Sequence, residues 1–171
     1  MLYRHCDDFI NVNLGERIMN KIGIAAVAMC TGLLMSNMLT AEEFASKSDA
    51  EAMVKKAVAH IKNVGIESAA EDFNNRKGDF VKLDLYVTVY NMQGVVLAHG
   101  QNKKSVGKDM MELKDPDGKE FVKERMTMAK SQSKFWQEYK FTDPVSKKVL
   151  PKEMYCEVVA KVVACAGIYK R

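Results

Sequence analysis

The first clear pattern in the chain is a run of apolar residues at helical spacing. Its members lie mostly three or four positions apart: Met53, Val54, Ala57, Val58, Ile61 and Val64. Ser48 and Glu51 form the S-x-x-E pattern of a capping box, and Gly65 ends the run, so the pattern predicts an amphipathic helix over 49–64. A shorter run of the same period predicts a second helix over 66–75.

The period then changes from that of a helix to that of a strand. In VKLDLYVTVY, residues 81–90, two kinds of side chain alternate, which predicts one strand with two different faces. NMQG is a turn sequence, and GVVLAH is the returning strand. If Tyr90 lies opposite Val95, then Tyr86 lies opposite His99, and Tyr86 and His99 share a face of the sheet.

The remaining elements complete the expected fold. A loop over 100–118 closes with D-P-D-G, a third helix follows at about 119–131, and KFWQEYKFT alternates as a strand. The last segment, YCEVVAKVVACAGIY, predicts a hairpin of two strands. Because hairpins dominate and no βαβ pattern repeats, we predict an α+β fold in which a long N-terminal helix and further helices pack on an antiparallel sheet of about five strands.

This last hairpin carries a pair of cysteines. With Ala160 and Lys161 at the turn, Cys156 lies directly opposite Cys165. Opposed residues of an antiparallel pair have Cα atoms roughly 4.5 Å apart at non-hydrogen-bonded positions, which a disulfide can span. We therefore predict a disulfide between them, and the alternative is two small buried thiols.

The start of the chain has the composition of a targeting segment. Asn20 and Lys21 precede an apolar run over 22–35, and a short polar segment behind it ends at Ala41. This order is typical of a secretory signal peptide, which we predict over 19–41 with cleavage near Ala41. An uncleaved N-terminal anchor is the alternative.

Acidic residues occupy the segment 1–18, where a signal peptide has basic or neutral ones. We therefore predict that Met19 is the true start and that 1–18 is an upstream extension. The remaining 42–171 has the length of one domain, and we expect it to be a bacterial periplasmic or secreted protein with no membrane span. The formal charge of +4 is spread along the chain, which favours small anions and gives no indication of nucleic-acid binding.

The sequence shows no spacing typical of a catalytic, haem or metal site. It contains no G-x-S-x-G, no C-x-x-C-H and no pair of histidines at ligand spacing. His60 falls among lysines on the first helix, where we expect it to be exposed, and D-P-D-G lacks the downstream acids of a calcium loop. We predict that the protein is not an enzyme and uses no cofactor or metal.

A set of polar-tipped aromatic and cationic side chains remains on the predicted strands. Its members are Tyr86, Tyr90, His99, Trp136, Tyr139, Lys152 and Tyr155. Such side chains build concave sites for small ligands, and a phenol, an imidazole and an ammonium together could hold a carboxylate. The strand period directs Trp136 and Tyr139 to opposite faces, and likewise Lys152 and Tyr155, so they cannot all share one pocket. Packing in the core or in cross-strand pairs is the alternative role.

Several short motifs follow one another in order along the chain. They are Gly94 with VLAH behind it, V-G-K at 106–108, L-K-D-P-D-G, the W-x-x-Y of Trp136 and Tyr139, P-K-x-x-Y at 151–155, and the closing G-I-Y. Together they resemble a single Cache domain of the sCache_2 type. The resemblance implies a PAS-like antiparallel sheet with a long N-terminal helix, in an extracytoplasmic sensor domain that binds small organic acids such as acetate, propionate or pyruvate.

The resemblance also implies which residues line the pocket. Tyr86 corresponds to an aromatic residue on a strand of the family, and His99 to a histidine at the end of a strand. Trp136 and Tyr139 correspond to the family's aromatic pair, and Lys152 and Tyr155 to its lysine and tyrosine behind a proline. We predict that these six residues bind the ligand. Thr88 and Gly100 stand where the family often has tryptophan and proline, which predicts a roomier pocket.

The sequence therefore predicts an extracytoplasmic domain that binds or senses a small organic anion, a carboxylate. Two residues follow Tyr169, so we expect a domain without its own output module, with a membrane receptor or kinase as the candidate partner. The alternative is an interaction protein that binds no ligand and docks on a membrane sensor or another periplasmic partner.

Overall fold

The computed structural model describes residues 44–171, so the predicted extension over 1–18 and signal peptide over 19–41 lie outside the described residues. The helices are α1 (Lys47–Val64), α2 (Ile66–Phe73) and α3 (Phe121–Ser131), with a short 3-10 helix, η1, at Lys103–Ser105. The strands are β1 (Val81–Lys82), β2 (Leu85–Tyr86), β3 (Thr88–Asn91), β4 (Val96–His99), β5 (Lys134–Thr142), β6 (Val149–Val159) and β7 (Val162–Tyr169). Within residues 44–171, no helix is long and apolar enough to cross a membrane.

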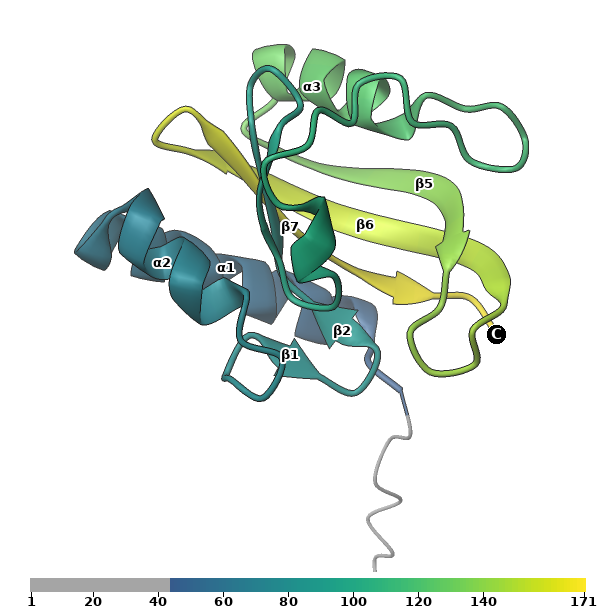
Figure 1. The fold of residues 1–171 in the computed structure, drawn as a ribbon, viewed down its shortest axis with the longest axis horizontal. Helices are drawn as coiled ribbons and strands as arrows, with labels where there is room; N and C mark the ends of the chain where they lie inside the picture. The colour runs from purple at the N-terminus through teal and green to yellow at the C-terminus, as the bar shows by residue number, and fades with distance from the viewer. Residues whose placement is uncertain (1–43) are drawn as a thin grey trace, which may run out of the picture. The chain divides into compact units, whose positions relative to one another are not determined.

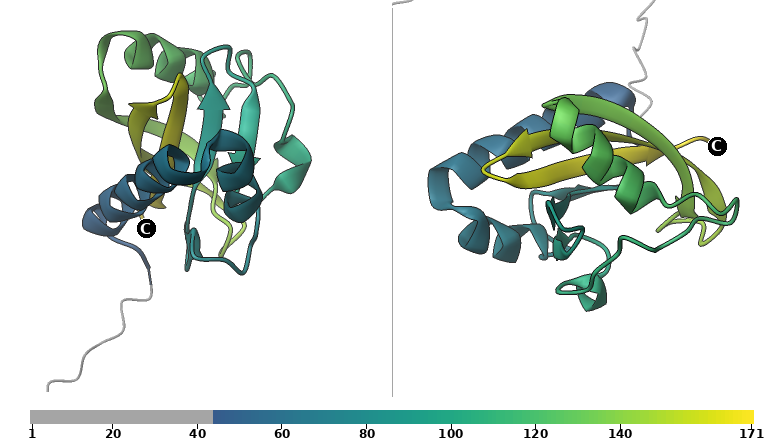
Figure 2. Two further views of the ribbon diagram at one scale, coloured as in Figure 1. Left: turned by 90° about the vertical axis from the view of Figure 1, so that its left-hand side faces the viewer. Right: turned by 90° about the horizontal axis from the view of Figure 1, so that it is seen from above.

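Strands β3 to β7 form one antiparallel sheet of five strands in the order β4-β3-β7-β6-β5, and β1 and β2 form a separate small hairpin. Helices α1 and α2 pack on one face of the sheet, and α3 packs on the other (Figures 1 and 2). The longest helix comes first in the described chain. These observations confirm the predicted fold class.

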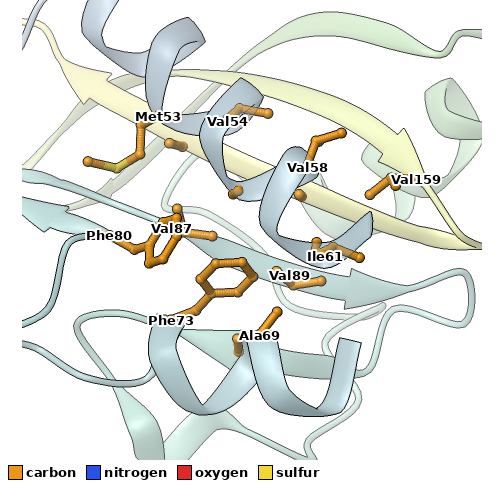
Figure 3. Close-up of a cluster of buried hydrophobic side chains, with 14 of the residues drawn as sticks. Met53, Val54, Val58, Ile61, Ala69, Phe73, Phe80, Val87, Val89 and Val159 are labelled. Carbon is orange, nitrogen blue, oxygen red and sulfur yellow. The ribbon is translucent and has the colours of Figure 1, made fainter. Parts of the chain in front are cut away.

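The core under α1 and α2 is built from the apolar stripe that the helical period predicted. Side chains of both helices meet strand residues on this face, among them Met53, Val54, Val58, Ile61, Ala69, Phe73, Val87, Val89 and Val159 (Figure 3). Burial of each large apolar side chain contributes about 1.5–3 kcal/mol to folding. This contribution, rather than helix propensity, holds α1 on the sheet.

The cap of α1 differs from the prediction. The backbone N–H of Asp49 donates to Ser46 Oγ at 3.2 Å, and the Asp49 carboxylate accepts from the Ser46 N–H at 2.9 Å. The predicted capping box of Ser48 and Glu51 is therefore wrong. The segment S-K-S-D-A-E contains two overlapping cap patterns, Ser46 with Asp49 and Ser48 with Glu51. The helix begins after Ser46, and Ala50 in its first turn is fully buried in the core.

The predicted single strand over 81–90 is also wrong, because a tight hairpin interrupts it. Leu83 has a left-handed φ of 56° at the turn between β1 and β2, and its side chain is 48% exposed. Asp84 is fully buried instead, since its carboxylate accepts from the N–H of Ala45 and pairs with Arg171. The sequence pattern did not indicate this turn, because Leu83 is apolar at the position where an uninterrupted strand would also have an apolar residue.

The register of β3 and β4 differs from the predicted one. Thr88 pairs with His99 and Tyr90 with Val96, and an irregularity lies between Val89 and Tyr90. The predicted pairs Tyr86–His99 and Tyr90–Val95 are wrong, because Tyr86 belongs to the β1–β2 hairpin and Val95 bridges a residue of the following connection instead.

The hairpin of β6 and β7 agrees with the prediction. Ala160 and Lys161 form its turn with left-handed φ values of 46° and 64°, as in a two-residue type I′ turn. Cys156 lies opposite Cys165 with a Cα separation of 4.2 Å, and their sulfurs are bonded. Both cysteines are fully buried in the core on the α3 face, so the predicted disulfide is confirmed.

Candidate ligand-binding site

A cavity of about 230 Å³ lies on the α3 face of the sheet, and we call it the main cavity because apolar and aromatic side chains enclose it, although a hollow beside α1 is larger, at about 360 Å³. Its apolar walls include Val96, Met110, Phe121, Phe141 and Met154, and its polar lining includes Tyr86, Thr88, Tyr90, His99, Asn102 and Tyr139. No aspartate or glutamate of the described residues lines it. The volume is below the roughly 300–1,000 Å³ of ordinary ligand pockets, so the cavity suits a small ligand without a positive charge.

The main cavity collects part of the predicted site. Tyr86, His99 and Tyr139 line it, and the Lys152 ammonium donates to Tyr86 Oη at 2.9 Å. Trp136 and Tyr155 pack against each other on the α1 face, with ring centroids 5.2 Å apart. The strand period thus separated these side chains correctly, and the structure does not bring Trp136 or Tyr155 to the cavity.

His99 is a buried imidazole whose hydrogen bonds select one tautomer. Its Nδ1 accepts from the backbone N–H groups of Gln101 at 3.3 Å and Asn102 at 3.0 Å. Burial, together with the charge of Lys152, lowers the pKa of His99 to about 4, so the ring is neutral at pH 7. Because Nδ1 is the acceptor, the proton is on Nε2, which becomes an oriented donor. The ring stacks on Tyr86 with centroids 5.1 Å apart.

Lys152 has an amino group that is enclosed by aromatic rings. It is 1% exposed, its Nζ lies 4.1 Å from the ring centroid of Tyr86 and 4.6 Å from that of Tyr169, and it donates to both hydroxyls. Burial, with a further contribution from the charge of Arg125, lowers the pKa of Lys152 well below its usual range. A carboxylate bound beside this ammonium would offset the cost of its burial.

The two carboxylates that raise the pKa of Lys152 already form ion pairs with another residue. Asp84 and Asp143 favour its charged form, but Arg171 pairs with both, at 2.8 Å and 3.0 Å. Lys152 therefore has phenol oxygens rather than carboxylates as its hydrogen-bond partners among the described residues.

Arg125 is a buried cation next to three aromatic residues of the cavity lining, and the sequence analysis did not single it out. It is fully buried, and the centre of its guanidinium lies 5.1 Å from the ring of Tyr90, 5.7 Å from Phe121 and 5.3 Å from Tyr139. Its position within the inward stripe of α3, next to Met126, was the available signal.

The two departures from the family pattern have different consequences. Thr88 lines the main cavity, and its buried Oγ1 has no hydrogen-bond partner among the described residues. At Gly100, an added Cβ would lie 2.9 Å from Val81 Cγ2 and 3.0 Å from Tyr86 Cβ. Gly100 thus allows the end of β4 to approach the β1–β2 hairpin and does not itself line the main cavity.

A second hollow of about 260 Å³ shares wall residues with the main cavity. Tyr86, His99 and Phe141 line both, and the exposed side chains of Arg76 and Lys147 line the second hollow alone. Asp143 also lines the second hollow, but its charge is paired with Arg171. Arg76 and Lys147 therefore leave this hollow with positive charge, which attracts anions.

Two other polar features have structural partners. His60 is half-buried rather than exposed as predicted, because its Nε2 lies 2.7 Å from an Asp72 oxygen and its ring packs 5.3 Å from that of Phe80. In D-P-D-G, the Asp115 carboxylate accepts from the backbone N–H groups of Asp117 and Lys119, both at 3.0 Å, which stabilises the turn.

A sequence model of the single Cache domain 2 family, sCache_2, matches residues 23–162. No curated protein matches the chain. Among solved structures, a methyl-accepting chemotaxis protein from Vibrio parahaemolyticus is similar, with a TM-score of 0.63 and 22% identity over 72% of this chain and 87% of that one.

Two further solved structures are similar over 72% of this chain. One is a Cache chemosensory domain described for its carboxylic acid recognition, with a TM-score of 0.64, 17% identity and 92% of that chain covered. The other is the periplasmic sensor domain of a chemotaxis protein, with a TM-score of 0.57, 19% identity and 90% of that chain covered. At these identities the likeness establishes the shared fold.

Proposed function

The chain belongs to the single Cache domain 2 family, and on that premise we propose that its domain is an extracytoplasmic sensor whose main cavity binds a small organic carboxylate. The observation that carries the proposal is the pairing of two donors at one end of the cavity. His99 offers an Nε2–H, and Lys152 lies behind Tyr86 with phenols as its hydrogen-bond partners. We call Lys152, Tyr86 and His99 the lysine end.

The chemistry of the lysine end favours an anion over a neutral or cationic ligand. A carboxylate accepts a hydrogen bond from the imidazole N–H of His99, and a nearby ammonium strengthens this bond more in the protein interior than it would in water. An amine would meet the charges of Lys152 and Arg125 without an acidic partner in the cavity lining. The apolar walls would hold a short hydrocarbon portion of the ligand.

Similar proteins support a sensory rather than a catalytic role. One similar structure is described for carboxylic acid recognition, and two others belong to chemotaxis proteins. We infer that the domain acts outside the cytoplasm, after export by the signal peptide predicted over 19–41, and that ligand occupancy is read by a membrane receptor or kinase.

A thermal-shift screen of residues 42–171 tests the proposal. The ligands are short carboxylates, with amines of matched size as the control class. A ligand at 100 times its Kd adds about 2.7 kcal/mol of stability, so a specific acid should raise the melting temperature while the matched amine leaves it unchanged. If no carboxylate raises it, ligand binding is excluded for this class, and the interaction protein becomes the better hypothesis.

Variants locate the site within the domain. We expect Lys152→Met and His99→Asn to weaken carboxylate binding about tenfold or more, because each removes a donor or a charge at the lysine end. Trp136→Phe and Tyr155→Phe are the matched controls, since both residues lie on the α1 face. If Trp136→Phe and Tyr155→Phe lost binding while Lys152→Met and His99→Asn bound normally, the ligand site would lie on the α1 face and not at the lysine end.

A further inference from the structure

The main cavity has a second polar end, which consists of Tyr90 and Tyr139 with Arg125 behind them. Tyr90 and Tyr139 line the cavity, and their rings lie against the guanidinium of Arg125. We call these three residues the arginine end.

Arg125 supplies a permanent positive charge to this end. Its Nε donates to Gln137 Oε1 at 3.0 Å, but its Nη1 and Nη2 have no hydrogen-bond partner among the described residues. Although burial opposes it, the phenols of Tyr139 and Tyr90 hold the pKa of Arg125 above its usual value. The adjacent Glu124 is occupied elsewhere, because it pairs with Lys119 at 2.8 Å and accepts from Gln137 Nε2 at 2.6 Å.

The arginine end offers hydrogen-bond donors as well as charge. Tyr90 and Tyr139 both line the cavity, so each hydroxyl can donate a hydrogen bond to a ligand. Their rings lie against the guanidinium, which places a fixed cation behind them. Such an arrangement recognises an oxyanion.

The spacing of the two ends follows from the β3–β4 register. Thr88 pairs with His99 at the lysine end, and Tyr90 pairs with Val96 two residues further along β3. Two residues of strand span roughly 7 Å. Thr88 Oγ1 lines the cavity, buried and without a hydrogen-bond partner among the described residues.

Building on the proposed function, we propose that the ligand is a short dicarboxylate, with one carboxylate at the lysine end and the other at the arginine end. The residue spacing and the cavity of about 230 Å³ together suit a linear acid of about four to five carbons. A monocarboxylate would leave the donors of one end without an acceptor, which costs affinity.

Calorimetric titration of the protein with matched acids tests this inference. The probes are succinate and glutarate, and the controls are succinamate, which has the same shape with one carboxylate replaced by an amide, and butyrate. We expect one of the dicarboxylates to bind at least tenfold more tightly than succinamate or butyrate. Tyr90→Phe and Tyr139→Phe should each reduce that preference, whereas Tyr155→Phe on the α1 face is the control variant and should leave it unchanged.

Each other outcome is decisive. Equal binding of butyrate and the dicarboxylates would overturn the dicarboxylate inference and leave the proposed carboxylate function in place. A dicarboxylate preference that survives both phenol removals would overturn the assignment of the second carboxylate to the arginine end. Failure of all four acids to bind, with the variants and the parent protein folded by circular dichroism, would overturn the inference. The thermal-shift screen over all short carboxylates would then decide on the proposed function separately.

Discussion

Two buried bases, Lys152 and His99, lie beside the same cavity, and burial keeps the pKa of each below its usual range. The folded protein therefore binds a proton at either group less strongly than the unfolded chain does. Wherever the unfolded chain is protonated at these groups, this difference lowers the free energy of unfolding. A site that prepares a charge for a ligand reduces the stability of the empty protein, and this trade can be measured residue by residue.

Lys152→Met should stabilise the empty protein at pH 7 by about 1 kcal/mol or more, because it replaces a buried ammonium by an apolar side chain of similar length. The folded protein holds fewer protons than the unfolded chain below the usual lysine pKa, so the stability of the parent rises with pH. The advantage of the variant should therefore shrink as the pH approaches that value. Urea unfolding at pH 7 and pH 9 measures both effects.

The exposed Lys148 provides the matched control, since Lys148→Met changes the same group at the surface and should alter stability by less than about 0.5 kcal/mol. A Lys152→Met protein less stable than the parent would mean that the hydrogen bonds to Tyr86 and Tyr169 outweigh the cost of burying the charge.

His99 should make the protein sensitive to acid. Its pKa falls from 6.5 in the unfolded chain to about 4, so between these values the unfolded chain takes up a proton that the folded protein does not. Stability should therefore decline as the pH drops from 6.5 toward 4, by up to about 3 kcal/mol.

His99→Asn isolates this effect. The asparagine carbonyl can still accept from the N–H groups of Gln101 and Asn102, but the side chain does not titrate. Urea unfolding of both proteins at several pH values should show a smaller acid loss in the variant. Parallel curves would mean that carboxylates alone produce the acid sensitivity.

At the scale of elements, the β6–β7 hairpin is the best-determined part of the sheet, because turn, register and disulfide agree. The disulfide Cys156–Cys165 closes a short loop, with a sequence separation of 9. Replacing both cysteines by alanine should lower the free energy of unfolding by about 3 kcal/mol, mostly through greater freedom of the unfolded chain.

Urea unfolding of the double variant, compared with the reduced and oxidised parent, tests this expectation. The native hairpin should persist in the variant, because its backbone pairing does not depend on the sulfurs. A variant as stable as the oxidised parent would show that this short loop is already restricted in the unfolded chain.

At the scale of the molecule, Arg171 joins segments that are distant in sequence. Its guanidinium pairs with Asp84 beside the β1–β2 hairpin and with Asp143 in the β5–β6 connection, and both carboxylates are fully buried. It also lies against the ring of Phe44, ahead of α1. One side chain thus links three separate segments of the chain.

Arg171→Met should cost about 3 kcal/mol or more, because it leaves two carboxylates buried without their cation. Urea unfolding measures the loss, and hydrogen exchange should show the β1–β2 hairpin opening first. Arg171→Lys should recover only part of the stability, since one ammonium lacks the fork that reaches both acids. Unchanged stability in the methionine variant would mean that water reaches these carboxylates.

The amino-acid sequence alone determined the elements whose signals are local. Helical spacing predicted α1 and α3, alternation predicted β5, and the β6–β7 turn placed Cys156 opposite Cys165. Each of these depends on residues close together in the chain, where the period of apolar side chains reports which face is buried. The same alternation separated Trp136 from Tyr139 before any contact was known.

Only the tertiary structure decided what depends on distant partners. Asp84 is buried because Arg171 reaches it, and the Leu83 turn therefore fits where alternation predicted a continuous strand. The β3–β4 pairing follows from an irregularity that no period reveals.

The site divides in the same way. His99, Tyr86, Tyr139 and Lys152 could be expected from residue type and order along the strands, whereas the placement of Arg125 behind Tyr90 and Tyr139 could not. A buried cation is tolerated only where rings and polar groups from several elements enclose it. That enclosure exists only once α3, β3 and β5 have packed together, so the second end of the cavity belongs to the fold and not to any one segment of the sequence.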